Sequence, residues 1–248
     1  MMTSVRDIYN FLDSLAPFDS QMEFDNSGLQ CGDFASAVES AMACLDVTPQ
    51  VIEQAAQVNC ELIVAHHPVL FRARKQLLSH DPAWLLARRG MACIASHTPL
   101  DCCAGGVNDL LADRLGLGEA ALLNSLIRLC TLPEPLTAKA LADFVAQKLN
   151  APVRYCDAGK PITQVAICGG EGCHFLEDVY GHANAFLTGD AGHHDFLDAA
   201  QHSLTLIAAG HFETEIQIIP VLTEKLRAAF PDVKWHIAEE HGVMRHAA

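Results

Sequence analysis

The stretch Glu61-Leu-Ile-Val-Ala-His-His-Pro68 decides the fold, because an apolar run rich in β-branched residues ends abruptly in two imidazoles and a proline. Short continuous apolar runs are typical of strands buried on both faces of a parallel sheet. Open α/β sheets place their functional sites outside the carboxyl ends of such strands. The stretch therefore predicts a buried strand at 62–65 that presents His66 and His67 to a site.

The same pattern returns at two later apolar runs. Residues 91–95 lead into His97 and Asp101, and residues 204–208 lead into His211 and Glu215. His211 and Glu215 are four residues apart, so a helix that begins there puts both side chains on one face. A single histidine is more often structural than functional, but three clusters that each follow an apolar strand favour a shared site.

Imidazole and carboxylate ligands together favour a transition metal over Mg or Ca. Such side chains can meet at one ion or bridge two, and Zn, Mn, Fe, Co or Ni are the metals that suit them. A carboxylate such as Glu215 can bridge two ions about 3.5–4 Å apart, and a bridging water would then be the nucleophile.

Strand and helix signals alternate along the chain. A polar, turn-rich stretch, 25–32, follows the first predicted helix, and the segment Glu213–Phe230 has the spacing of one long helix with a kink at Pro220. Other helices are predicted at 5–15, from Pro49 onward with Thr48 as its cap, and at 82–89, 107–115, 136–149, 175–182 and 195–201. Strands are predicted at 38–45, 62–65, 91–95, 126–132, 153–156, 162–168, 185–188, 204–208 and 234–238.

Two runs of the chain can be laid over each other, which indicates a degenerate duplication. The run from Ala43 to His97 and the run from Val165 to His211 are both strand, helix, strand with a polar end, and strand ending in histidine. The fold class is therefore α/β, with two related, interlinked α/β lobes and mostly parallel sheets. We expect a first lobe at 1–125, completed by 211–248, and a second lobe at 126–210.

Composition limits the classes of partner. The formal net charge of −14 offers no cationic field for phosphates, so nucleic-acid binding is not expected. Neither a signal peptide nor an apolar run of about 18 residues is present, which predicts a soluble cytoplasmic protein with no membrane contact. Arg72, Arg74 and Lys75 form a compact basic group, which is either a solvated loop or an anion-binding lip beside the histidines.

The ten cysteines contain no Cys-x-x-Cys pair, so reduced thiols that act as small hydrophobic side chains are expected. Cys102 and Cys103 lie near the predicted site, but adjacent cysteines seldom chelate one ion well.

Five motifs in order resemble the Nif-three-like family, whose bacterial members are often labelled GTP cyclohydrolase I type 2 homologues. The resemblance runs nearly end to end. It rests on Asp25-Asn-Ser-Gly-Leu-Gln-Cys-Gly32, Ala65-His-His-Pro68, Ser96-His-Thr-Pro-Leu-Asp101 with Gly105-Gly-Val-Asn-Asp109, Thr188-Gly-Asp190 with His194, and Gly210-His-Phe-Glu-Thr-Glu215.

The resemblance implies a toroidal homohexamer with a dinuclear metal site in each subunit. The family's ligands fall on His66, His67, Asp101, His211 and Glu215, which are residues already selected on spacing. His97 matches a position near the metals, and His97 or His194 would move protons. Thr98-Pro-Leu, where the family more often has Thr-Asn-Leu, and the Cys102-Cys103 pair depart from the family's pattern, but neither departure removes a ligand.

Two classes of function fit this resemblance. The first is a metal-dependent hydrolase acting on a small anionic or nucleotide substrate, either as a GTP cyclohydrolase I type 2 homologue or as a metallophosphoesterase. The second is a ring-shaped metal-binding scaffold or regulator without turnover, which acts through protein partners. The sequence leaves open whether Asp190 and His194 contact substrate or stabilise the fold.

Overall fold

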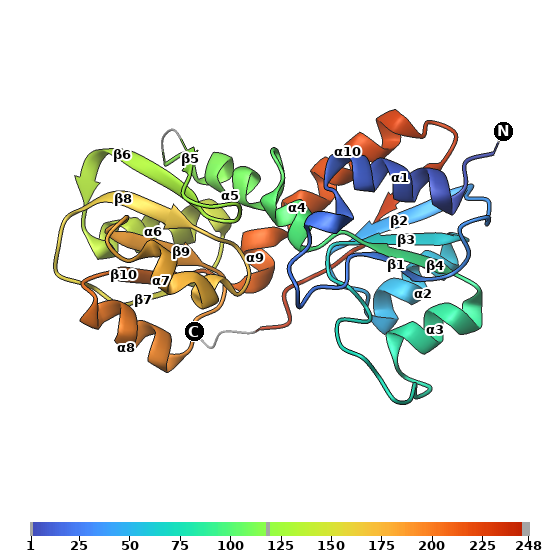
Figure 1. The fold of residues 1–248 in the computed structure, drawn as a ribbon, viewed down its shortest axis with the longest axis horizontal. Helices are drawn as coiled ribbons and strands as arrows, with labels where there is room; N and C mark the ends of the chain where they lie inside the picture. Colours follow the sequence, from blue (N-terminus) through green and yellow to red (C-terminus); the bar gives the residue numbers. More distant parts are fainter. Residues whose placement is uncertain (1, 118–119, 245–248) are drawn as a thin grey trace. The chain divides into compact units, whose positions relative to one another are not determined.

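The computed structural model describes residues 2–117 and 120–244, which form two compact units. Unit 1 comprises the residues up to Cys103 and Ile218–His241. Unit 2 comprises Ala104–Gln217 and the described residues after His241. Each unit is an α/β layer structure built on one sheet (Figure 1).

Unit 1 contains a five-stranded sheet in the order β1-β4-β3-β2-β11. Strands β4, β3, β2 and β11 are parallel, and β1 pairs antiparallel with β4 at one edge. Every residue of β2, β3 and β4 is buried, as expected for a parallel sheet covered on both faces. The strands are β1 (Gly28–Cys31), β2 (Ser40–Cys44), β3 (Leu62–Ala65), β4 (Ala92–Ala95) and β11 (Lys234–Ile237).

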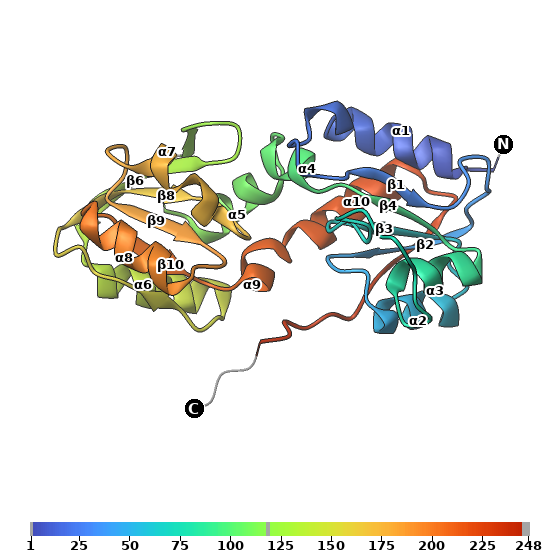
Figure 2. The ribbon, with the colours of Figure 1, turned by 60° about the horizontal axis from the view of Figure 1, so that its bottom comes forward.

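Helices cover both faces of this sheet. Helices α1 and α10 lie on one face and α2 and α3 on the other (Figure 2). Ser4 caps α1 in a capping box with Asp7, and Thr48 caps α2 ahead of Pro49, which confirms both predicted helix starts. The helices are α1 (Val5–Leu15), η1 (Phe18–Ser20), α2 (Pro49–Gln57), α3 (Pro82–Arg89), α4 (Thr98–Cys102) and α10 (Ile218–Ala229).

Unit 2 contains a six-stranded sheet in the order β5-β6-β8-β9-β10-β7. Only β8, β9 and β10 run parallel, because β5, β6 and β8 pair antiparallel and β7 is an antiparallel edge beside β10. The expectation of a mostly parallel second sheet was therefore wrong. The strands are β5 (Ala120–Leu122), β6 (Arg128–Leu136), β7 (Arg154–Tyr155), β8 (Ile162–Ile167), β9 (Ala185–Thr188) and β10 (Thr205–Ala208).

The core of unit 2 lies between this sheet and helices α5 and α6. Leu111, Leu141, Val165 and Leu187 are among its fully buried members. Asn150 ends α6 and Gly116 ends α5, both in the left-handed conformation that allows a helix to stop. The helices are α5 (Val107–Leu115), α6 (Ala138–Leu149), η2 (Gly172–Phe175), α7 (Leu176–Val179), α8 (His193–Gln201) and α9 (His211–Glu215).

The two units share the predicted repeat. Strands β2, β3 and β4 are parallel neighbours in unit 1, with β3 between the other two. Strands β8, β9 and β10 are parallel neighbours in unit 2, with β9 between the other two. The α/β fold class with two related, interlinked units is confirmed.

The boundaries of the units differ from those expected. The chain passes from unit 1 to unit 2 after Cys103 and returns after Gln217, whereas the sequence suggested 125 and 210. Helix α5 belongs to unit 2 because its apolar face packs into the core with α6, and α9 belongs to unit 2 as well. The prediction of a single helix at 213–230 was wrong, because the chain passes from unit 2 to unit 1 within that segment. It is two helices, α9 and α10, and Pro220 lies in the first turn of α10.

Across residues 2–117 and 120–244, we find no helix whose length and apolar character would let it span a bilayer.

Candidate metal centre

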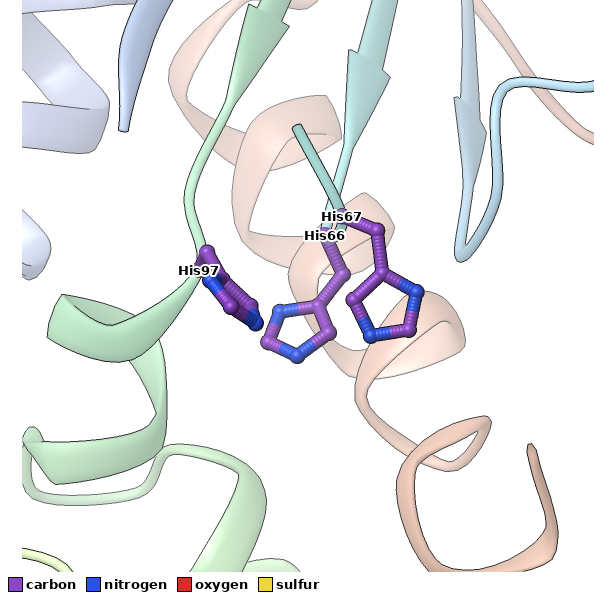
Figure 3. A group of neighbouring side chains, drawn as sticks. All are labelled: His66, His67 and His97. Atoms are coloured by element: carbon purple, nitrogen blue, oxygen red, sulfur yellow. The ribbon is translucent and has the colours of Figure 1, made fainter. Parts of the chain in front are cut away.

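Three histidines of unit 1 gather at the carboxyl ends of two paired strands. His66 and His67 follow β3 directly, and His97 lies two residues beyond β4. Because β3 and β4 are parallel and Ala65 is paired with Ala95, residues that leave the two strands emerge at the same edge. The three rings form a compact triangle (Figure 3), with centroids 4.8 Å apart for His66 and His67, 5.3 Å for His66 and His97, and 5.4 Å for His67 and His97. One ligand atom from each histidine lies within 4.8 Å of those of the other two, so the group could hold a metal ion.

Each ring in this group is fixed by an oxygen at Nδ1. His66 Nδ1 lies 2.9 Å from the carbonyl oxygen of Ser96, His67 Nδ1 lies 2.9 Å from Asp46 Oδ1, and His97 Nδ1 lies 2.8 Å from Asp25 Oδ1. A carbonyl oxygen only accepts hydrogen bonds, so Nδ1 of His66 carries the proton and Nε2 keeps its lone pair. The same arrangement orients metal-binding histidines in many proteins.

Asp25 is a buried anchor for His97. It accepts hydrogen bonds from the Thr98 amide at 3.0 Å and the Thr98 hydroxyl at 2.5 Å, while the His97 amide donates to Ser27 Oγ at 3.0 Å. Burial alone would raise the pKa of Asp25, but the hydrogen bonds from His97 and Thr98 outweigh burial and hold that pKa well below its usual range. Asp25 is therefore a fixed carboxylate behind His97.

Asp46, the partner of His67, follows β2 and is itself positioned by the end of the chain. Glu240 accepts hydrogen bonds from the amides of Leu45 at 2.7 Å and Asp46 at 2.9 Å. Burial raises the pKa of Glu240, although both amide bonds favour its charged form. The segment after β11 thus supports the carboxylate that orients His67.

Asp101 adds a carboxylate to the donors of unit 1. It lies in α4, whose first residue follows His97, and its Oδ1 is 3.5 Å from His66 Nε2. His66 is fully buried and the Asp101 side chain is 13% exposed, so both donors are largely withdrawn from bulk water. The predicted ligands His66, His67 and Asp101 are therefore close neighbours.

Unit 2 contains a second histidine and carboxylate pair, at the two ends of α9. His211 and Glu215 lie four residues apart on one helix face, and His211 Nε2 is 3.3 Å from Glu215 Oε2. Asp190, which follows β9, holds the other ring nitrogen, with His211 Nδ1 at 2.7 Å from Asp190 Oδ2. Asp190 therefore fixes the His211 ring through Nδ1.

The turn after β8 is shaped around the Glu215 carboxylate. Gly170 has a φ of +60°, and a β-carbon there would overlap Glu215 Oε1 and lie 3.3 Å from His211 Nε2. The Gly170 amide donates to Thr214 Oγ1 at 3.1 Å, and the Gly169 amide donates to Asn108 Oδ1 at 2.8 Å. The glycines of this turn therefore admit the Glu215 side chain, which is nearly fully buried.

Both donor sets fit a transition metal by their chemistry. In all four of His66, His67, His97 and His211, an oxygen atom engages Nδ1, which is the arrangement that leaves Nε2 as the ligand atom. Carboxylate oxygens of Asp101 and Glu215 lie close to these rings. Imidazole nitrogen with carboxylate oxygen suits Zn, Mn, Fe, Co or Ni.

The remaining candidates differ in how they are placed. His194 lies exposed in α8 with its ring 5.4 Å from that of His193. Arg72, Arg74 and Lys75 are exposed, and the Arg74 guanidinium pairs with Asp81 at 2.6 Å. Among the residues that the structure describes, the groups that could hold a metal contain no cysteine, so neither Cys102 nor Cys103 is among them.

Several residues of these donor sets were not selected from the sequence. Asp25 was placed in a turn-rich stretch and in a family motif but given no role, and Asp46 and Gly170 were not considered as part of the site. A usable signal did exist, because Asp46 and Gly170 each come two or three residues beyond a buried strand that ends beside the site.

Comparisons with known proteins agree with this fold. The family model described as Duf34/NIF3 (NGG1p interacting factor 3) matches residues 3–242. The protein named GTP cyclohydrolase 1 type 2 homolog from Clostridium acetobutylicum is 31% identical, over 92% of this chain and 91% of its own length. The protein of the same name from Campylobacter jejuni is 32% identical, over 89% and 91%. The crystal structure of Staphylococcus aureus protein SA1388 shares the fold, with a TM-score of 0.90, 99% of both chains covered and 24% identity.

Proposed function

The chain belongs to the Duf34/NIF3 family, and from that premise we propose that it binds two divalent transition-metal ions and acts as a metal-dependent hydrolase. The observation that carries this proposal is the repeated support of the histidines, each with Nδ1 engaged by an oxygen. Four such arrangements at strand ends are the pattern expected of a metal centre rather than of isolated structural histidines.

The proposal assigns His66, His67, Asp101, His211 and Glu215 to one dinuclear centre. Two ions need more donors than either unit's set supplies, since protein sites commonly provide three or more ligands to each ion. The chain order is compatible with this assignment, because Asp101 and Glu215 each lie two residues before the chain passes from one unit to the other. His97 is either a further ligand or a proton-transfer group beside the ions.

Divalent ions held by these residues would supply an activated water and polarise the bond to be broken. The residues themselves have separate tasks. Ser96, Asp46 and Asp190 hold the imidazoles of His66, His67 and His211 in the ligating orientation. Asp25 does the same for His97 and favours a proton on its Nδ1, which leaves Nε2 to accept or donate a proton at the reacting group.

The substrate, assembly and location follow the family resemblance. We propose a small anionic or nucleotide substrate, as the name of the relatives suggests, a homohexameric assembly and a cytoplasmic location. A scaffold or regulator that binds metal and protein partners without turnover is the competing function, and the same experiment separates the two.

The experiment is a hydrolysis screen of the metal-loaded wild type against GTP, phosphate esters and peptides, with the metal content of each sample measured. We expect metal-dependent turnover of at least one class, which is lost in His66→Ala. His182→Ala, a change at an exposed histidine of unit 2, serves as the control. A protein that is fully loaded with metal but turns over none of these compounds would contradict the hydrolase and favour the scaffold.

A further inference from the structure

Two phenylalanines of unit 1 lie exposed beside the histidine group. Phe24 is 57% exposed and Phe71 is 39% exposed, and their ring centroids are 6.2 Å apart in an edge-on arrangement. The Phe71 ring centroid is 5.9 Å from that of His97, nearly perpendicular to it. Phe24 directly precedes Asp25, the carboxylate that holds His97. We call Phe24 and Phe71 the aromatic lip.

Hydrogen bonds hold the backbone on both sides of the lip. Asn26 Nδ2 donates to the carbonyl oxygen of Leu70 at 2.7 Å, and Gln30 Oε1 accepts from the Leu70 amide at 3.2 Å. These bonds join the segment after His67 to the turn-rich stretch 25–32, which also supplies Asp25 and Ser27 to His97. The motif Asp25-Asn-Ser-Gly-Leu-Gln thus fixes a metal-site histidine and the backbone next to Phe71 at the same time.

We propose that the aromatic lip is a subsite that binds a flat conjugated ring of the substrate next to the metal centre. This inference rests on the proposed function. Exposed phenyl faces and edges attract planar rings through offset or edge-on packing, and such contacts do not depend on the identity of the ring's polar groups. Since Phe71 also contacts the His97 ring, a ring bound on the lip lies beside the residues that hold the metals.

A surface for a protein partner is the main alternative, and the chain offers a control for it. Leu77 and Leu78 are also exposed, at 44% and 47%, and lie in the same connection between β3 and α3. An apolar surface for a second copy of this chain or for another protein would use these leucines as well as the phenylalanines. Binding at a ring-binding subsite requires Phe24 and Phe71 and does not change when Leu77 and Leu78 are replaced.

The experiment measures binding of guanosine, adenosine and riboflavin as flat-ring probes, and of ribose 5-phosphate as a probe without a conjugated ring, by calorimetry on the metal-loaded full-length protein. We expect the wild type to bind at least one flat-ring probe. Phe24→Leu with Phe71→Leu should weaken that binding about ten-fold or more, which is the size of a lost stacking contact. Phe71→Tyr keeps the ring and should bind within about two-fold of the wild type.

The controls separate failure of the lip from failure of the proposed function. Leu77→Ala with Leu78→Ala should leave probe binding unchanged, and the metal content of every variant should equal that of the wild type. The subsite is overturned if no flat-ring probe binds the metal-loaded wild type. It is also overturned if the variant with Phe24→Leu and Phe71→Leu binds the probe as tightly as the wild type, or if that variant differs from the wild type only in oligomeric mass. A wild type that holds no metal overturns the proposed function instead, and probe binding measured on the same sample still decides the lip.

Discussion

The carboxylate of Glu215 occupies the space that a β-carbon at Gly170 would need. The turn after β8 and the helix after β10 are therefore adapted to each other at the donor atoms of unit 2. His211 Nε2 borders the same space, so a side chain at position 170 would disturb both members of the pair.

Gly170→Ala should cost more free energy of metal binding than free energy of unfolding. The left-handed backbone at Gly170 costs a non-glycine residue about 1 kcal/mol, and the displaced Glu215 carboxylate adds the loss of a ligand. Gly181→Ala is the matched control, because Gly181 has a φ of +79° with open space around it. Thermal unfolding and metal titration of both variants test the prediction, and equal metal affinity in the two would refute it.

Asp190→Asn should weaken metal binding about 10- to 100-fold, because the amide no longer provides a carboxylate to orient and polarise His211. The measurement is a competition titration with a chromophoric chelator. Asp198→Asn, at an exposed position of α8, is the control and should bind metal as the wild type does. If Asp190→Asn matches this control, Asp190 does not act through His211.

His97→Ala and His194→Ala should differ in their effects. His97 lies with His66 and His67 and is held by buried Asp25, whereas His194 is exposed in α8. We expect His97→Ala to lower turnover by about 100-fold or more, as expected for loss of a proton-transfer group or ligand, and His194→Ala to change it by less than about two-fold. Steady-state kinetics at saturating metal decide this, and a larger loss in His194→Ala would reverse the assignment.

Asp109→Asn should destabilise the protein at neutral pH by about 1–3 kcal/mol, because it removes the carboxylate from the nearly buried Arg128 guanidinium, which keeps its hydrogen bonds to the carbonyl oxygens of Ser125 and Leu126. Burial by itself would raise the pKa of Asp109, but the hydrogen bonds from Arg128 and the Gly105 amide outweigh burial and lower it. Because the pKa of Asp109 is lower in the folded state, its carboxylate stabilises the fold at pH values above the unfolded pKa of about 3.9. That stabilisation is lost as the pH falls from this value through the folded pKa.

Chemical unfolding of Asp109→Asn between neutral pH and about pH 3 should therefore show a gap from the wild type that narrows below about pH 4. Asp143→Asn removes an exposed pair with Lys139 in the same unit and should leave the free energy of unfolding close to that of the wild type at every pH. A gap that stays constant with pH would show that the Asp109 charge is not the source of the stabilisation.

The parts of the fold that local pattern controls could be predicted from the sequence. The buried strand at 62–65, the capped starts of α1 and α2, and the end of α5 at Gly116 all follow from signals within a few residues. The break between α9 and α10 could not be predicted, because the apolar spacing continues across it. The break arises because α9 packs in unit 2 and α10 in unit 1.

The donor atoms could be predicted better than their supports. His66, His67 and His211 follow apolar strands or strand ends, which is a strong local signal. Asp25 supports a histidine 72 residues away, and Glu240 supports Asp46 from 194 residues away. Such pairs depend on how the strands are ordered in the sheet, and the short polar strand β1, which brings Asp25 to its place, had no apolar pattern to reveal it.

The most direct test of the proposed dinuclear centre is the number of transition-metal ions bound per chain, measured by elemental analysis after loading and removal of excess metal. The wild type should hold about two ions, and His66→Ala and Glu215→Ala should each lower the content. If one centre uses both residues, the two changes combined should cost less metal affinity than the sum of the separate losses. Fewer than about one ion per chain in the loaded wild type, or strictly additive losses in the double variant, would contradict a shared two-metal site.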